Sequence, residues 1–155
     1  MDQESYDKGR DALKAEDYKA AEKNFREAFN SIEEHHELYN KLASYLGLSQ
    51  VLLSDRNGLL LCRDAASSET NDGDVFLYLA CAEWHTENRE RAIDAVSRGC
   101  KIDGDHELLQ RAGLLLDSRR GSVVPFLPRR HMLNRVLGFL VRRTPTRLSV
   151  HHLLY

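Results

Sequence analysis

The sequence predicts an all-α protein. Apolar residues recur at spacings of three and four through most of the chain, which is the period of amphipathic helices. All three prolines lie after residue 124, so none interrupts a helix before that point. β-branched residues are scarce, and no long stretch alternates apolar with polar residues as a half-buried strand would. Together these observations favour helices and argue against strands before residue 117.

Seven helices are expected in residues 1–117 from the apolar periodicity and the polar turns between the periodic segments. The first five span about Gln3–Lys14, Tyr18–Ser31, His36–Leu53, Gly58–Ser67 (after a turn and cap at residues 54–57) and Asp74–His85. The sixth lies between Arg89 and Asp103, and the seventh spans about Asp105–Asp117. The seventh helix carries Leu108, Ala112, Leu115 and Leu116 at helical spacing.

The stretch from Asp74 to Asp103 reads as two helices joined by a polar turn. Its first helix carries apolar residues on two neighbouring faces, with Phe76, Leu79 and Ala80 on one and Leu77, Cys81 and Trp84 on the other. Two apolar faces indicate a helix packed between others. The small residues Ala80, Ala92 and Gly99 allow the helix backbones to approach closely.

This unit resembles the tetratricopeptide repeat, a two-helix unit of about 34 residues. The resemblance rests on Gly9, Asp17, Tyr18, Ala21, Phe25 and Ala28 in the first unit, Leu42, Tyr45, Leu46, Gly58, Leu59, Cys62 and Ala65 in the second, and Phe76, Leu79, Ala80, Ala92, Ile93, Val96 and Gly99 in the third. It implies a right-handed superhelix of three helical hairpins, followed by a capping helix and a basic C-terminal helix. The alternative is a helical bundle without true repeats.

Charge divides the chain into two parts. Residues 1–117 carry 24 acidic and 14 basic side chains, a net charge of −10, whereas residues 118–155 carry eight arginines and no acidic residue, a net charge of +8. We therefore expect a helical repeat domain with its capping helix over residues 1–117. Residues 118–155 form an arginine-rich extension that is expected to be helical at 131–143. For residues 146–155 the sequence leaves open a last short helix or a frayed end.

Composition also bears on location. No apolar run approaches the roughly 20 residues that a membrane span needs, and the acidic N-terminus is unlike a signal peptide. The three cysteines are odd in number and fall inside predicted helices, which favours reduced thiols. A cytoplasmic protein is expected.

In the tetratricopeptide family the first helix of each hairpin lines a concave groove that binds segments of other proteins. The resemblance therefore implies partner contacts from Tyr6, Arg10, Leu13, Asn40, Gln50, Leu77 and Trp84. The subset of the family that grips a terminal carboxylate uses lysine, asparagine and arginine here, and only Arg10 and Asn40 fit. A partner with apolar anchors is expected instead, and the acidic body favours basic partners. Alternatively, Leu77 and Trp84 are core residues covered by the chain's own tail.

The basic tail, with Arg129, Arg130, Arg135, Arg142 and Arg143 as its candidate contacts, has four interpretations. It folds back on the acidic body, recruits a partner or a second copy, binds nucleic-acid phosphates, or lies on an anionic membrane. The sequence holds no recognised nucleic-acid motif, and an acidic body repels a polyanion, so nucleic acid is disfavoured as a partner.

Catalytic patterns are missing from the sequence. Cys81 and His85 lie four residues apart, which could present two metal ligands or an activated thiol, but a zinc site needs three or four protein ligands and no second pair has this spacing. No phosphate-binding glycine loop or hydrolase motif occurs. We expect no enzyme, metal or cofactor, and instead a protein interaction module, either an adaptor or a small chaperone-like scaffold. The alternative is a nucleic-acid-associated regulator that contacts phosphates through the tail.

Overall fold

The computed structural model describes residues 2–116 and 149–155, and this part of the chain contains helices and no strand. The all-α prediction is confirmed for the described residues. The helices are α1 (Gln3–Lys14), α2 (Tyr18–Asn30), α3 (Tyr39–Leu52), α4 (Asn57–Ser68), α5 (Gly73–His85), α6 (Arg89–Ile102), α7 (Glu107–Leu116) and α9 (Val150–Leu154). The predicted helix at 131–143 lies outside the described residues.

The predicted helix bounds are close to the observed ones, and the largest difference is at the start of α3. His36 was expected to begin this helix, but it lies in a turn, and α3 begins at Tyr39. The Nδ1 atom of His36 accepts a hydrogen bond from the backbone N–H of Leu38 at 3.1 Å. A side chain that bonds to the backbone two residues later stabilises a turn in competition with the helix.

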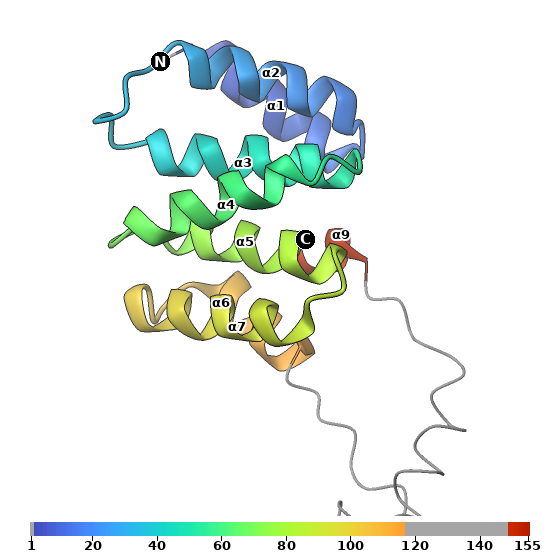
Figure 1. Ribbon diagram of the computed structural model, residues 1–155, viewed down its shortest axis with the longest axis vertical. Coiled ribbons are helices and arrows are strands. Elements are labelled where there is room, and N and C mark those ends of the chain that lie inside the picture. Colours follow the sequence, from blue (N-terminus) through green and yellow to red (C-terminus); the bar gives the residue numbers. More distant parts are fainter. Residues whose placement is uncertain (1, 117–148) are drawn as a thin grey trace, which may run out of the picture.

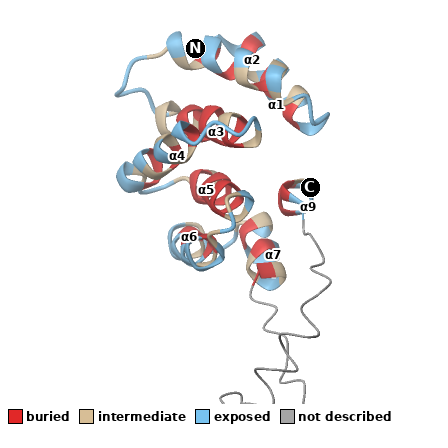
Figure 2. Ribbon diagram, turned by 45° about the vertical axis from the view of Figure 1, so that its right-hand side comes forward, coloured by how far each residue is buried: buried red, intermediate tan, exposed pale blue. Residues whose placement is uncertain are grey.

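The helices pair in sequence order, and the pairs stack along the long axis of the molecule (Figure 1). α1 packs on α2, α3 on α4 and α5 on α6, while α2, α4 and α6 each also pack on the following helix. In addition, α3 contacts α5 and α5 contacts α7. Since α3 and α5 have neighbours on several sides, nearly all their central residues are buried (Figure 2). The prediction that Asp74–His85 packs between other helices is confirmed.

The three turns inside the helix pairs are built alike. Each contains a non-glycine residue with positive φ, namely Glu16 at 60°, Ser54 at 68° and Glu87 at 64°. In each turn the next residue donates its backbone N–H to the carbonyl oxygen five residues earlier, over 2.9, 2.9 and 2.8 Å. This bond satisfies a carbonyl group at the end of the helix. The same backbone conformation and hydrogen bond therefore reverse the chain direction in all three helix pairs.

Small residues set the distance between neighbouring helices. A Cβ atom on Gly47 of α3 would lie 2.6 Å from the carbonyl oxygen of Gly58 in α4 and 2.7 Å from Cys62 Sγ. Ala80 and Ala92 are buried between α5 and α6, and a Cβ on Gly99 would lie 2.8 Å from Phe76 Cβ. The close approach predicted for these small residues is confirmed at Gly99, and Ala80 and Ala92 are buried.

α7 covers the end of the stack, packing on α5 and α6. Its buried residues are Leu109, Ala112 and Leu116, whereas the predicted stripe included Leu108 and Leu115, which are half-buried. The helix was expected to begin at Asp105, but it begins at Glu107. The residue before it, His106, accepts the backbone N–H of Leu109 with its Nδ1 atom at 3.3 Å.

Replacing Gly47 with alanine tests the close approach of α3 and α4. The added methyl group meets a backbone carbonyl that cannot rotate away, and overpacking of this kind costs about 1–3 kcal/mol. We expect urea unfolding to show a lower midpoint with an unchanged m-value.

The matched control is Gly113→Ala in α7, where the nearest atom to an added Cβ, Val96 Cγ1, lies at an ordinary 3.4 Å. Alanine gains about 1 kcal/mol over glycine in a helix interior, so this variant should be as stable as wild type or more stable. A Gly47→Ala protein that matches the control would contradict the assigned contact.

Candidate functional site

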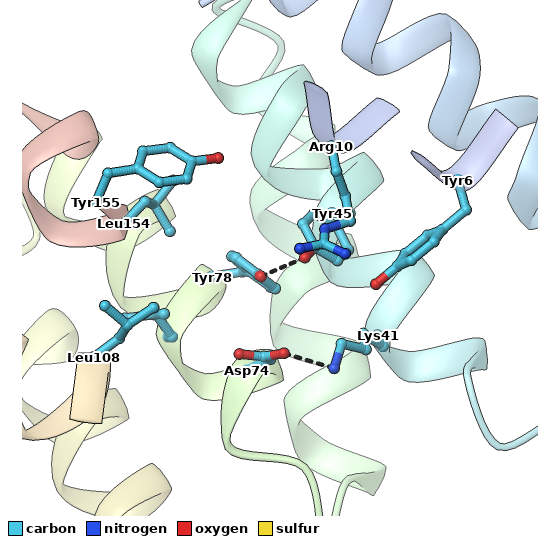
Figure 3. A pocket seen from close by; sticks show the side chains of 10 residues that line it. Tyr6, Arg10, Lys41, Tyr45, Asp74, Tyr78, Leu108, Leu154 and Tyr155 are labelled. Atoms are coloured by element: carbon cyan, nitrogen blue, oxygen red, sulfur yellow. Dashed lines mark hydrogen bonds and ion pairs between the residues drawn. The ribbon is translucent and has the colours of Figure 1, made fainter. Parts of the chain in front are cut away.

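A polar cavity of about 300 Å³ opens between helices that are distant in sequence (Figure 3). Its lining residues come from α1, α3, α5, α7 and α9: Tyr6, Arg10, Lys41, Tyr45, Asp74, Leu77, Tyr78, Leu108, Leu154 and Tyr155. The surface formed by α1, α3, α5 and α7 around this cavity is called the inner groove below. The odd-numbered helices of the stack therefore face one common side.

Two tyrosines form the floor of the cavity. Tyr78 donates a hydrogen bond from its hydroxyl to the hydroxyl of Tyr45 over 2.6 Å, and the two ring centroids are 4.2 Å apart. Burial raises the pKa of both hydroxyls, so both stay protonated at neutral pH. Because Tyr45 accepts this bond, its own O–H remains able to donate to a further acceptor.

Arg10 supplies a positive charge beside these hydroxyls. Its guanidinium carbon lies 5.7 Å from the centroid of the Tyr6 ring, a cation–π distance. Figure 3 shows the guanidinium pointing toward the hydroxyls of Tyr45 and Tyr78. Within residues 2–116 and 149–155, no carboxylate forms an ion pair with Arg10. This corner of the cavity is therefore rich in hydrogen-bond donors.

The carboxylates of the cavity are already paired. Lys41 Nζ lies 2.6 Å from Asp74 Oδ2 and 3.1 Å from Asp72 Oδ2, and His106 Nε2 lies 2.9 Å from Asp74 Oδ1. Burial alone would lower the pKa of Lys41 and raise the pKa of Asp74, but the hydrogen bonds and charges within this group outweigh burial. The pKa of Lys41 is raised and the pKa of Asp74 is lowered. Asp72 and Asp74 therefore share the charge of Lys41, and Asp74 is also hydrogen-bonded to His106.

The short helix α9 lies against the inner groove. It contacts α5 and α7, and Figure 2 shows it on the side of α5 away from α4 and α6. Val150, Leu153 and Leu154 are buried in this contact, and Leu154 and Tyr155 close one side of the cavity. Residues 150–154 are helical, which resolves the alternative that the sequence left open for this end of the chain.

Tyr155 bridges the two edges of the groove. Its backbone oxygen accepts a hydrogen bond from Arg111 Nη1 of α7 at 2.9 Å, and its ring centroid lies 5.9 Å from Lys14 Nζ of α1. Both contacts are exposed, and contacts between exposed groups contribute little.

Burial and ordering of α9 nearly balance. Burying the three aliphatic side chains contributes roughly 1.5–3 kcal/mol each. Fixing the backbone of the five helical residues costs roughly 1–2 kcal/mol each. Because the two sums are of similar size, the docking of α9 is marginal.

The structure brings together three of the seven predicted groove residues. Tyr6, Arg10 and Leu77 line the cavity, and Leu77 is fully buried. Leu13 is also buried, as part of the core. Trp84 is half-buried near the end of α5 and does not line the cavity.

The other two predicted groove residues have structural partners elsewhere. Asn40 donates to Glu69 Oε2 at 3.0 Å and accepts from the hydroxyl of Ser68, so it holds the loop that follows α4. Gln50 lies where α3 approaches α4, with its Cβ 2.7 Å from a Cβ built on Gly58. The predicted tail residues Arg129, Arg130, Arg135, Arg142 and Arg143 lie outside the described residues.

Sequence reasoning missed most of the polar residues of the cavity, including Lys41, Tyr45 and Tyr78. Tyr45 was assigned only to the repeat pattern, and the recurrence of tyrosine midway along two successive inner helices could have pointed to the pair. The spacing of Val150, Leu153 and Leu154, at i, i+3 and i+4, indicates a helix that docks through one face.

The candidate thiol does not form a reactive site. Cys81 is fully buried, and burial raises the pKa of its thiol well above the usual range, whereas His85 is exposed. Thiolate is the nucleophilic form, so this cysteine is unreactive at neutral pH. In the part of the chain that the structure describes, no three metal-ligating side chains gather, and no helix is long and apolar enough to cross a membrane.

Comparison with known proteins gives no relative. No protein-family model, no curated protein and no solved structure matches this chain.

Replacing Asp74 with asparagine tests the charge group of the cavity. The pKa of Asp74 is lower in the folded protein than in the unfolded chain, so its contribution is present above about pH 4 and is lost as the pH falls through the folded-state pKa. We expect the variant to lose about 1–3 kcal/mol of unfolding free energy at pH 7. In urea titrations the difference between wild type and variant should shrink as the pH falls below about 4.

Asp94→Asn, at an exposed position on α6, is the control and should change stability by no more than about 0.5 kcal/mol. A stability difference between wild type and Asp74→Asn that stays constant with pH would contradict the assignment.

Proposed function

We propose that this chain is a non-enzymatic interaction module with the architecture of tetratricopeptide repeats, in which three hairpins form a right-handed superhelix. The proposal is supported by the three like-built turns at Glu16, Ser54 and Glu87. It is further supported by the regular packing, in which alternate helices share one side. In this architecture α7 is the capping helix that covers the apolar face of the last hairpin.

The inner groove binds a helical segment of another protein through apolar anchors. The observation that carries this proposal is that the groove already receives a short amphipathic helix, α9, through Val150, Leu153 and Leu154. A surface that accepts one such face is suited to others with the same spacing, which is the helix-in-groove mode of recognition.

Local charge refines the partner's chemistry. The described body of the chain is acidic as a whole, but Asp72 and Asp74 at the groove are ion-paired with Lys41, and Asp74 is also hydrogen-bonded to His106. Arg10 and Lys14 form no ion pair among the described residues. An acidic side chain beside the apolar anchors would meet Arg10 and Lys14, which would orient the segment in the groove. An adaptor or a small chaperone-like scaffold has this mode of binding.

Leu108→Asp tests the proposed groove. Leu108 is half-buried on α7 and lines the cavity with Leu154, so a carboxylate there would oppose apolar docking. We expect the full-length variant to lose a partner that wild type captures from native lysate. Titration of that partner should show a loss of about 2 kcal/mol or more, roughly 30-fold in Kd.

Leu114→Asp is the matched control, because Leu114 is on the same helix but 80% exposed and lines no part of the cavity. This control should bind the partner as wild type does. Equal binding by both variants, or equal loss in both, would place recognition outside the inner groove.

A further inference from the structure

α9 occupies only part of the inner groove. Its apolar side chains rest on α5 and α7, while the cavity of about 300 Å³ remains between α9 and the side chains of α1 and α3. In Figure 3, Leu154 and Tyr155 stand on one side of this cavity, opposite Arg10 and Tyr6. A segment longer than α9 could therefore fill space that α9 leaves open.

The docked face of α9 has a simple pattern. Val150, Leu153 and Leu154 are buried, whereas His152 is exposed and hydrogen-bonds to Ser149 within its own segment, Nδ1 to Oγ at 2.8 Å. Apart from the exposed contacts of Tyr155, the seat of α9 is thus defined by apolar side chains at i, i+3 and i+4.

The stack does not depend on α9 for its main contacts. The ring contacts that join α1, α2, α3 and α5 are made without any residue of α9, and so are the close helix approaches at Gly47 and Gly99. A helix that docks marginally, and whose release leaves these contacts intact, can be exchanged for another.

We propose that α9 occupies in cis the seat of the partner's helix, so that the partner and α9 compete for the inner groove. This inference rests on the proposed function and specifies it. The partner presents a short helix with apolar side chains spaced as Val150, Leu153 and Leu154 are. If its helix extends past the position of Tyr155, it also presents a hydrogen-bond acceptor to Arg10 and the hydroxyl of Tyr45.

A labelled peptide with the sequence of residues 149–155 serves as the probe. It is titrated by fluorescence anisotropy against the full-length wild type and against full-length Leu153→Asp. Leu153 is fully buried in the α9 contact, so the substitution should release α9 and leave the groove open. The apparent Kd is the intrinsic Kd divided by the fraction of open grooves, so if α9 fills about nine grooves in ten, the variant binds the peptide about tenfold more tightly.

Adding Leu108→Asp to the Leu153→Asp chain should abolish this gain, whereas adding Leu114→Asp should preserve it. Equal affinity of wild type and Leu153→Asp for the peptide would overturn the competition. It would leave the proposed function standing, since that is judged separately by partner capture with Leu108→Asp and Leu114→Asp. Binding of the peptide to neither chain would also overturn the inference.

Hydrogen exchange on the wild type gives a second readout that does not depend on a variant. The amides of His152 and Tyr155 are hydrogen-bonded within α9, to the carbonyl oxygens of Ser149 and His151. Saturating unlabelled peptide should accelerate exchange in residues 150–155 and leave α2 unchanged. If α9 stays protected while the peptide is bound, the two occupy different sites and the inference fails.

Discussion

The structure depends on a run of contacting aromatic rings that crosses the helix pairs. Phe25 of α2 stacks on Tyr45 of α3 with centroids 4.6 Å apart, and Tyr45 lies 4.2 Å from Tyr78 of α5. Tyr6 of α1 meets Tyr45 edge-on at 5.8 Å. Aromatic pairs in such arrangements contribute about 0.5–1.5 kcal/mol beyond the area they bury. One tyrosine therefore holds three consecutive hairpins in register.

The same rings make the floor of the inner groove, and this joins stability to recognition. The rings of Tyr45 and Tyr78 belong to the core, yet their hydroxyls face the cavity. A polar group that is positioned by a packed ring cannot rotate away, so the donors of the groove are preorganised and lose little entropy when they meet an acceptor. Substitutions at these tyrosines would therefore change stability and binding together, which is why the more peripheral Leu108 is the better probe of recognition.

Most of the helical framework could be predicted from the sequence because it is encoded locally. Helical period, small residues at contacts and polar turns predict the seven helices of residues 1–117 and the buried character of α5. The left-handed residues Glu16, Ser54 and Glu87 carried no such signal, because a glycine is the usual sign of this conformation. The start of α3 was missed because a single histidine side chain favoured a turn.

The groove could be predicted only in part because its geometry depends on helix rotation and on long-range contact. Of the residues that the repeat register assigned to the groove, Tyr6, Arg10 and Leu77 line the cavity. The rotation of each helix about its axis decides which other residues do so, and the cavity is lined by Tyr45 and Tyr78 and not by Gln50 and Trp84. The pairing of Lys41 with Asp74 joins residues on separate helices. The position of α9 joins elements separated by all the residues between Leu116 and Ser149, and no local rule reaches that far.

The brevity of α9 explains why it can act as an exchangeable occupant. A helix of five residues cannot persist alone in water, because nucleation is unfavourable and isolated helices are marginal below about 12–15 residues. α9 therefore orders as it docks, and the groove supplies the apolar contacts that make the helix stable. A partner helix that belongs to a folded protein is already ordered, so it loses less conformational entropy on binding than α9 does. The same apolar contacts would then give the partner a higher affinity. Covalent attachment favours α9 through its high local concentration, and preorganisation favours the partner. In the proposed competition, the balance between these two effects would decide which helix fills the groove.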